Sequence, residues 1–119
     1  MGLLLQAQGA IAPSTSEPFV VIDGQLRLRA VSQLAEKLVG VSELSAVGRA
    51  LHEFLEPAER RPHAEAELNA LLRNVALGSA QPRGTAVLRP RATFGVRHGV
   101  RIGRCEPGRA ALIVFEEPL

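Results

Sequence analysis

The sequence has no tryptophan or tyrosine, and its four aromatic residues are all phenylalanine. It therefore offers few flat rings on which nucleic-acid bases or a large planar cofactor could stack. Its one cysteine, Cys105, excludes an internal disulfide and has no cysteine neighbour at metal-binding spacing, which fits a reducing cytoplasm. No apolar run approaches the ~18 residues that a membrane span needs. No basic residue precedes the leucines near the N-terminus, so a secretory signal is not predicted, and we expect a soluble, cytoplasmic protein that binds no membrane.

The charge balance argues against direct binding of nucleic acid. The formal net charge is +2, and the basic residues, nearly all arginine, are scattered rather than gathered into one run. Hydrophobic residues make up 46% of the chain and the mean hydropathy is +0.10, which excludes a disordered chain. With 119 residues, we expect one domain with a real hydrophobic core.

The motifs of common enzymes are also missing. The sequence has no GxSxG elbow, no glycine-rich phosphate loop, and no HExxH or Cys–His arrangement. The histidines at 52, 63 and 98 are too dispersed to predict a metal site. Glu56 and Glu59, beside two arginines, are more simply the solvated start of a helix. We therefore expect no catalytic residues and no metal.

The first structural signal is a hairpin. Asp23-Gly24 stands between FVVI and QLRL, which predicts a two-residue type I′ turn between strands over 19–22 and 25–30. In the second strand, leucines alternate with arginines, a pattern typical of a sheet with one dry and one wet face.

Three short helical pieces are predicted next. Ser32 can cap a helix that Gly40 ends, and Ser42 can cap a second one that Gly48 ends. The third piece places three apolar residues on one face before a proline stops it; these residues are Leu51, Phe54 and Leu55.

A longer helix is predicted over 58–78, followed by strands. One face of this helix carries an apolar stripe made of Leu68, Leu71, Leu72 and Val75. We expect residues 79–90, with two prolines, to form a loop holding at most one short strand. Alternation then predicts strands around 92–96, 100–102 and 110–117, with turns at His98-Gly99 and within 106–109.

This order predicts an α+β fold, a five-stranded antiparallel sheet with the helices inserted between strands 2 and 3 and packed on one face. The stretch FVVIDGQLRLRAVSQLAEKLVGVSELSAVGRALHEFLEPAER resembles the first half of a PAS domain. The resemblance rests on Asp23-Gly24, Gly40, Gly48 and Pro57 with Glu59. It covers about residues 18–117, more loosely in the second half. Ser32 and Glu59 stand where the family usually has Asn and Asp.

The resemblance implies a sensory or interaction module rather than an enzyme. We expect residues 18–119 to form the PAS-like domain, and residues 1–17 an N-terminal helix and linker. The chain would be the regulatory part of a larger transcription regulator or sensor kinase, as in two-component systems, with a linked or separate output domain.

A ligand would lie between the sheet and the helices, and periodicity suggests an apolar pocket lining. Each of these residues also fits a plain core position; they are Val21, Leu38, Leu51, Phe54, Leu68, Leu71, Phe94, Val96, Ile102, Leu112 and Val114. We expect a small apolar or weakly polar ligand of unknown identity, or no ligand.

The positions of Cys105 and His63 bear on two cofactors, flavin and haem. Flavin-binding light sensors of this family carry a reactive cysteine ahead of the long helix, so the late position of Cys105 excludes flavin-cysteinyl photochemistry. Haem-binding members use a histidine on the long helix, where this chain has His63. On an ideal helix His63 points about 130° away from the apolar stripe, so we expect it, like His52, to face solvent, and haem is not favoured.

The alternative is a ligand-free interaction module that dimerises. Leu4, Leu5 and Ala7 or Ile11 could form an apolar stripe on the N-terminal helix, through which two copies would pair as a homodimer. The same helix could instead fold back on its own sheet.

Overall fold

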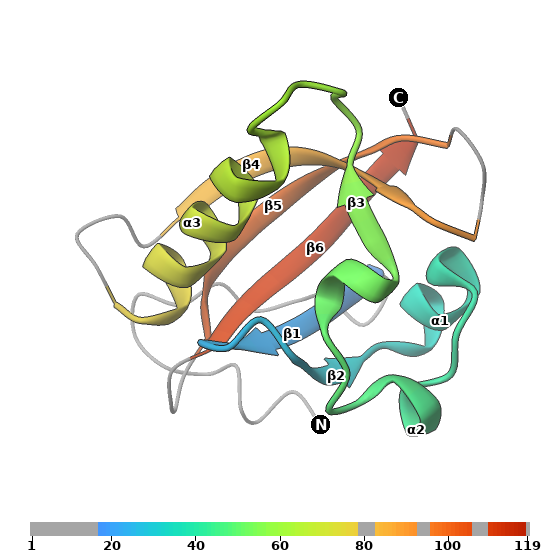
Figure 1. The fold of residues 1–119 in the computed structure, drawn as a ribbon. Coiled ribbons are helices and arrows are strands. Elements are labelled where there is room, and N and C mark those ends of the chain that lie inside the picture. Colours follow the sequence, from blue (N-terminus) through green and yellow to red (C-terminus); the bar gives the residue numbers. More distant parts are fainter. Residues whose placement is uncertain (1–16, 79–82, 93–95, 106–109, 119) are drawn as a thin grey trace.

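The computed structural model describes residues 17–78, 83–92, 96–105 and 110–118. Figure 1 shows its strands and helices. The strands are β1 (Phe19–Asp23), β2 (Leu28–Val31), β3 (Leu55–Pro57), β4 (Arg83–Pro90), β5 (His98–Cys105) and β6 (Ala110–Pro118). The helices are α1 (Gln33–Val39), α2 (Glu43–Ala46), the 3₁₀ helix η2 (Leu51–Glu53) and α3 (Ala64–Ala76). Within these ranges, no helix combines the length and the apolar character needed to cross a membrane.

All six strands belong to one antiparallel sheet in the order β2-β1-β6-β5-β4-β3. The last strand in the chain therefore lies between the first hairpin and the remaining strands. The expected α+β fold is confirmed, with six strands where five were predicted. The additional strand is β3, in which Leu55 pairs with Pro90; the prediction that Leu55 belongs to a helical piece was wrong.

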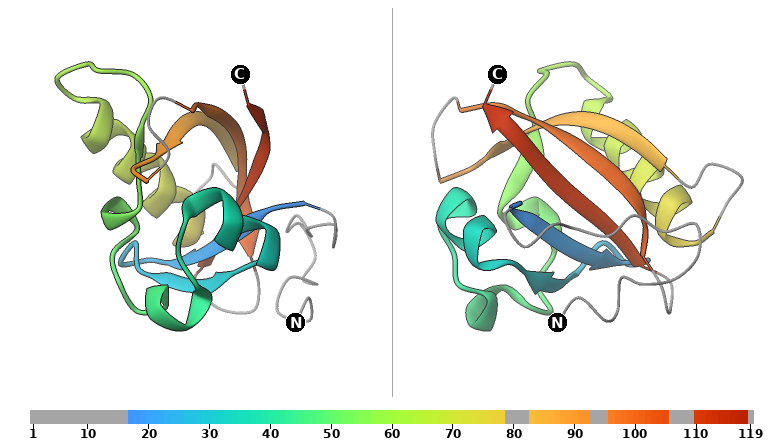
Figure 2. Two further views of the ribbon diagram at one scale, coloured as in Figure 1. Left: turned by 90° about the vertical axis from the view of Figure 1, so that its right-hand side faces the viewer. Right: turned by 180° about the vertical axis from the view of Figure 1, so that it is seen from behind.

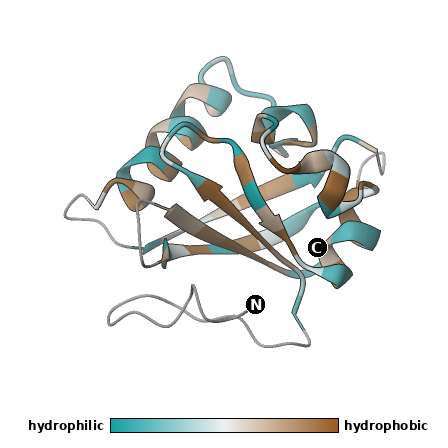
Figure 3. Cartoon of the chain, turned by 90° about the horizontal axis from the view of Figure 1, so that it is seen from below, coloured by the Kyte–Doolittle hydropathy of each residue, from teal (hydrophilic) through white to brown (hydrophobic). Residues whose placement is uncertain are grey.

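The described helices cover one face of the sheet, as the nearly edge-on view in Figure 2 shows. The main core fills the space between the two layers, and hydrophobic residues follow the strands that form its floor (Figure 3). Its largest fully buried side chains are Phe115, Ile22, Leu28, Leu72, Leu88, Ile102 and Ile113. A second buried cluster lies on the opposite face of the sheet and consists of Val21, Cys105, Leu112 and Val114.

The first hairpin forms where predicted, but its turn differs. Leu26 N donates to Asp23 O, and Asp23 N donates to Arg27 O, both over 3.0 Å, so three residues connect the strands instead of two. Leu26, with φ 61°, takes the left-handed conformation that a type I′ turn would have assigned to the Asp-Gly pair. The glycine serves another purpose, because a Cβ on Gly24 would lie 2.6 Å from Leu77 Cδ2.

The predicted caps of the short helices are confirmed. The Ser32 side chain accepts a hydrogen bond from Ala35 N, and Gly40 ends α1 with φ 83°. Ser42 caps α2 in the same way, and the turn that follows closes at Gly48 with φ 91°. These signals are local, which explains why the sequence shows them clearly.

Most differences between the predicted and the observed secondary structure lie in the second half of the chain. Residues 79–90 were predicted to be mainly loop, yet β4 runs from Arg83 to Pro90. The long helix begins only at Ala64, since residues 58–63 form a bend and turn. No strand forms at the described positions of 92–96: Ala92 lies in a turn and Val96 is exposed.

His98 is a further correction. It was predicted to be a turn residue, but it begins β5 and is only 5% exposed. Its Nδ1 lies 2.8 Å from Glu116 O, and its ring meets Phe115 edge-on. The predicted turn within 106–109, the predicted N-terminal helix and Phe94 lie outside the described residues.

Candidate functional site

An open groove of about 200 Å³ separates α3 from β3 and β4 on the helical side of the sheet. Its floor is apolar: Leu68 and Leu71 extend from α3, and Ala86 and Leu88 from β4. Leu68 and Leu71 are half-buried against the main core, so the groove is a shallow extension of the core surface. Residues 85–88 of β4 form one wall and α3 forms the other, and Pro57, Glu59 and Arg61 also line the groove.

Arg61 lies at the rim of the groove and pairs with two carboxylates. Its Nη2 lies 2.6 Å from Glu67 Oε1 and its Nε lies 2.6 Å from Glu59 Oε2. The two carboxylates hold the pKa of the Arg61 guanidinium above its usual range, chiefly through the hydrogen bonds. The Arg61 hydrogen bond also lowers the pKa of Glu67. Because Glu59, Arg61 and Glu67 are exposed to solvent, their ion pairs contribute little to the stability of the fold. Their main effect is to hold the Arg61 side chain at the rim of the groove.

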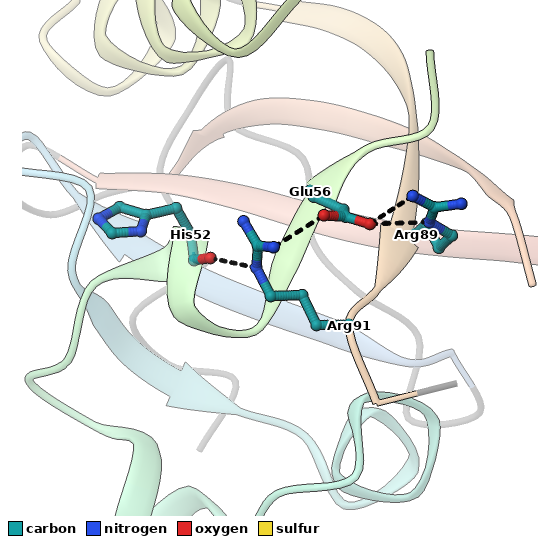
Figure 4. Close-up of polar contacts among 4 residues, drawn as sticks. All are labelled: His52, Glu56, Arg89 and Arg91. Atoms are coloured by element: carbon teal, nitrogen blue, oxygen red, sulfur yellow. Dashed lines mark hydrogen bonds and ion pairs between the residues drawn. The ribbon is translucent and has the colours of Figure 1, made fainter. Parts of the chain in front are cut away.

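A second charged cluster fixes the edge strand that borders the groove (Figure 4). Arg89 Nε donates to Glu56 Oε2 over 2.9 Å, and Arg91 Nη1 donates to Glu56 Oε1 over 2.8 Å. Arg91 Nε also donates to His52 O over 2.7 Å. The hydrogen bond from Arg89 is the largest of the effects that hold the pKa of Glu56 below its ordinary value. The cluster ties η2 and β3 to β4.

The residues predicted to line one pocket lie in several different parts of the structure. Leu68 and Leu71 line the groove, and Phe54 lines a second open hollow near the end of α1. Leu51 and Ile102 are fully packed in the main core, against which Leu38 is partly buried.

Three other predicted lining residues belong to the opposite face. The structure places Val21, Leu112 and Val114 in the second cluster, so they do not face the helices, and their assignment to a helix-side pocket is corrected. Alternation identifies buried positions in a strand but not which face of the sheet each one joins when both faces are covered. Val96 is exposed and lines no part of the groove.

The candidate cofactor ligands lie away from the groove floor. His63 is exposed and precedes the first residue of α3, and His52 is exposed on η2, both as predicted. Cys105 is buried on the opposite face of the sheet. Among the described residues, no group of three His, Cys, Asp or Glu side chains is placed to hold a metal ion.

The β4 wall of the groove was not predicted from the sequence. The prolines at 82 and 90 suggested a loop with at most one short strand over residues 79–90, a range that includes Thr85, Ala86, Val87 and Leu88. The alternation of Ala86 and Leu88 with Thr85 and Val87 could have indicated the strand.

Comparisons with known proteins identify the fold through structure. No protein-family model matches the sequence, and no curated protein matches it significantly. The PAS domain of the quorum-sensing receptor RpfR from Cronobacter turicensis, in complex with BDSF, matches with a TM-score of 0.64 and 9% identity. This match covers 90% of the present chain and 98% of the other.

Two further PAS-type structures match. The PAS domain of an HTR-like protein from Haloarcula marismortui has a TM-score of 0.59 and 14% identity, with 87% of each chain covered. The photoactive yellow protein domain from the sensor histidine kinase Ppr of Rhodospirillum centenum has a TM-score of 0.57 and 16% identity. This match covers 85% of the present chain and 84% of the Rhodospirillum centenum domain. Together with the sheet order and the helices inserted after β2, these matches show that the chain has the PAS fold.

Proposed function

We propose that the chain is a sensory and signal-transduction module that works without catalysis in the cytoplasm, as the regulatory part of a transcription regulator or sensor kinase. The PAS fold supports this role, because its structural neighbours include a domain of a quorum-sensing receptor and a domain of a sensor histidine kinase. A receptor domain in complex with BDSF is an example of ligand binding on this fold.

The groove between α3 and β4 is the observation that carries the proposal. A small apolar or weakly polar ligand would lie on Leu68, Leu71 and Ala86, with a polar group toward Arg61 or Thr85 at the rim. At about 200 Å³, the groove is smaller than the ~300–1,000 Å³ typical of ligand pockets. The ligand is therefore a compact molecule rather than a haem or a flavin, and we expect purified protein to show no visible absorption band from either.

Native mass spectrometry of freshly purified protein tests the ligand. We expect a bound mass in the unaltered chain, and its loss in Ala86→Leu, whose larger side chain fills the groove floor. The matched control is Ala70→Leu on the exposed side of α3, which leaves the groove open. A bound mass that persists in Ala86→Leu would contradict this location.

Ala86→Leu must be shown to fold, because overpacking can cost about 1–3 kcal/mol. A circular dichroism spectrum and a cooperative thermal transition like those of Ala70→Leu provide this check. An unaltered chain that carries no bound mass, and that acquires none after incubation with cell extract metabolites, would overturn the ligand proposal itself.

A second candidate function is a ligand-free dimerisation module. Its basis is an apolar cluster on a sheet face where the described chain places no helix; the cluster consists of Val21, Cys105, Leu112 and Val114. Two copies would pair over this face through residues 1–16, with an output domain linked to the chain or separate from it.

Deletion of residues 1–12 tests this second candidate. We expect a dimer to become a monomer in sedimentation velocity. A dimer that survives the deletion would rule out the N-terminal segment as the contact between copies.

A further inference from the structure

The outer edge of β4 is only partly paired. On one side, β4 pairs with β5 from Arg83 to Leu88. On the other side, β3 pairs with β4 only from Leu88 to Pro90. The N-terminal half of β4 thus has a neighbouring strand on one side alone, in the part of the chain that the structure describes.

The direction of the backbone groups along this edge follows from one hydrogen bond. Ala58 N donates to Val87 O over 3.0 Å, so the Val87 carbonyl points away from β5. Backbone groups in an antiparallel strand alternate in direction, so the N–H and C=O groups of Thr85 and Arg83 point the same way. Strand β3 ends at Pro57, and a bend follows at residues 58 and 59, so β3 does not continue along this edge. The Thr85 donor and acceptor therefore face outward, available to an added strand.

The ligand groove lies directly beside this edge. Thr85 and Ala86 line it, and α3 forms its other wall. The α3 wall is held close to β4, since a Cβ on Gly84 would meet Leu71 Cδ1 at 2.8 Å. A strand added along the edge would place one inward-facing side chain opposite Ala86, over the apolar floor.

Strand β3 of the same chain is an example of a strand that pairs with this side of β4. Leu55 of β3 is buried on the inner face, while Glu56 lies opposite Arg89 on the outer face and accepts two hydrogen bonds from it. Arg83 lies on the same face of β4 as Arg89. It is exposed, and no ion pair joins it to another described residue. An acidic side chain opposite Arg83 would complement it as Glu56 complements Arg89.

We propose that the edge of β4 from Arg83 to Thr85 docks an extended segment of a partner protein by strand addition. The segment runs antiparallel to β4, with an aliphatic side chain in the groove and an acidic residue opposite Arg83. This docking does not depend on the proposed ligand. Because the aliphatic side chain uses the same groove, a bound ligand and a docked strand exclude each other.

A synthetic peptide tests the proposal by nuclear magnetic resonance titration of the complete chain. The probe is the acetylated and amidated hexapeptide Lys-Leu-Thr-Val-Glu-Thr, whose leucine, first threonine, valine and glutamate face Ala86, Thr85, Gly84 and Arg83. We expect shifts of the Thr85 amide and the Leu71 methyl groups at submillimolar to millimolar peptide.

Two N-methylated peptides provide the matched control. N-methylation of the first threonine removes the N–H that meets Thr85 O and should weaken binding about tenfold or more. N-methylation of the valine removes an N–H that points away from the edge and should change binding less than about twofold. Equal weakening by both, or no shift at Thr85 at millimolar peptide, would overturn the proposal.

A charge exchange tests the acidic requirement separately. Arg83→Glu should weaken the peptide about threefold to tenfold, and a peptide with lysine in place of its glutamate should restore binding to this variant. If Arg83→Glu binds the original peptide as tightly as the unaltered chain does, the acidic residue is not part of the recognition.

Discussion

Two glycines take left-handed conformations at the ends of short helical turns. Gly40 has φ 83° and Gly48 has φ 91°. A Cβ on Gly40 would also approach Ala92 Cβ at 3.2 Å, while a Cβ on Gly48 would enter open space. An alanine at position 48 would therefore cause backbone strain alone, while an alanine at position 40 would cause backbone strain and steric crowding.

Replacement of each glycine by alanine should destabilise the fold. We expect Gly48→Ala to lower the free energy of unfolding by about 1 kcal/mol, through strain alone, and Gly40→Ala to lower it somewhat more. Urea denaturation at neutral pH measures both. An unchanged midpoint in Gly48→Ala would contradict the left-handed conformation at that residue.

Ser32 joins a helix to a strand through one hydroxyl. Its Oγ accepts from Ala35 N over 3.2 Å at the start of α1 and from Phe19 N over 2.9 Å in β1. We expect Ser32→Ala to cost about 1–2 kcal/mol of unfolding free energy, since both donors lose their acceptor. Ser42→Ala, which removes a cap on the exposed helix α2, should cost less, and equal losses in denaturation curves would argue against the second contact of Ser32.

At the scale of elements, the attachment of β3 depends on Glu56. Its pKa is lowered in the folded state by the Arg89 hydrogen bond, so its contribution to stability is present above the ordinary value of 4.5 and is lost as the pH falls through the folded-state value. Glu56→Gln should therefore destabilise the protein at pH 7, with a difference that shrinks below about pH 4.5.

A second variant separates this cluster from ordinary surface ion pairs. Glu67→Gln removes an exposed partner of Arg61, so its effect on the thermal midpoint at pH 7 should be smaller than that of Glu56→Gln. Thermal melts between pH 3 and pH 7 provide the comparison. A difference that grows on acidification would have the wrong sign for this account.

Elements with local signals could be predicted from the sequence, and those defined by distant partners could not. Helix α1 has a serine cap and a glycine end that lie within its own segment. Strand β3 has only three residues, and its pairing with β4 involves residues more than thirty positions away. His98 and Gly99 were predicted to form a turn, yet pairing with β4 and β6 makes His98 a buried strand residue.

The candidate site was predicted only on its helical side. The apolar stripe of α3 indicated that Leu68 and Leu71 line a pocket. The two prolines in residues 79–90 suggested a loop instead of β4, so Thr85 and Ala86 were not predicted as lining residues. Alternation in β1 and β6 identified Val21 and Leu112 as buried without showing that they face away from the helices.

At the scale of the whole molecule, the helical layer and the sheet share one closely packed core. Leu72 of α3 is fully buried among residues of the central strands. Leu72→Ala should lower the free energy of unfolding by about 2–5 kcal/mol, because it leaves a cavity between the layers. Leu44→Ala on α2, where the side chain is 95% exposed, should stay within about 0.5 kcal/mol in the same urea titration. A similar small loss in Leu72→Ala would mean that α3 does not pack on the sheet.

The proposed sensory function depends on where a small molecule binds to this domain. A nuclear magnetic resonance screen of compact apolar and weakly polar fragments, with assigned amide and methyl signals, measures the entry site directly. The account predicts that the binding fragments shift the Leu68 and Leu71 methyl groups and the Thr85 and Ala86 amides first, and that Ala86→Leu abolishes these shifts. Fragments that leave these groups unshifted, or that shift only Leu112 and Val114 on the opposite face, would contradict it.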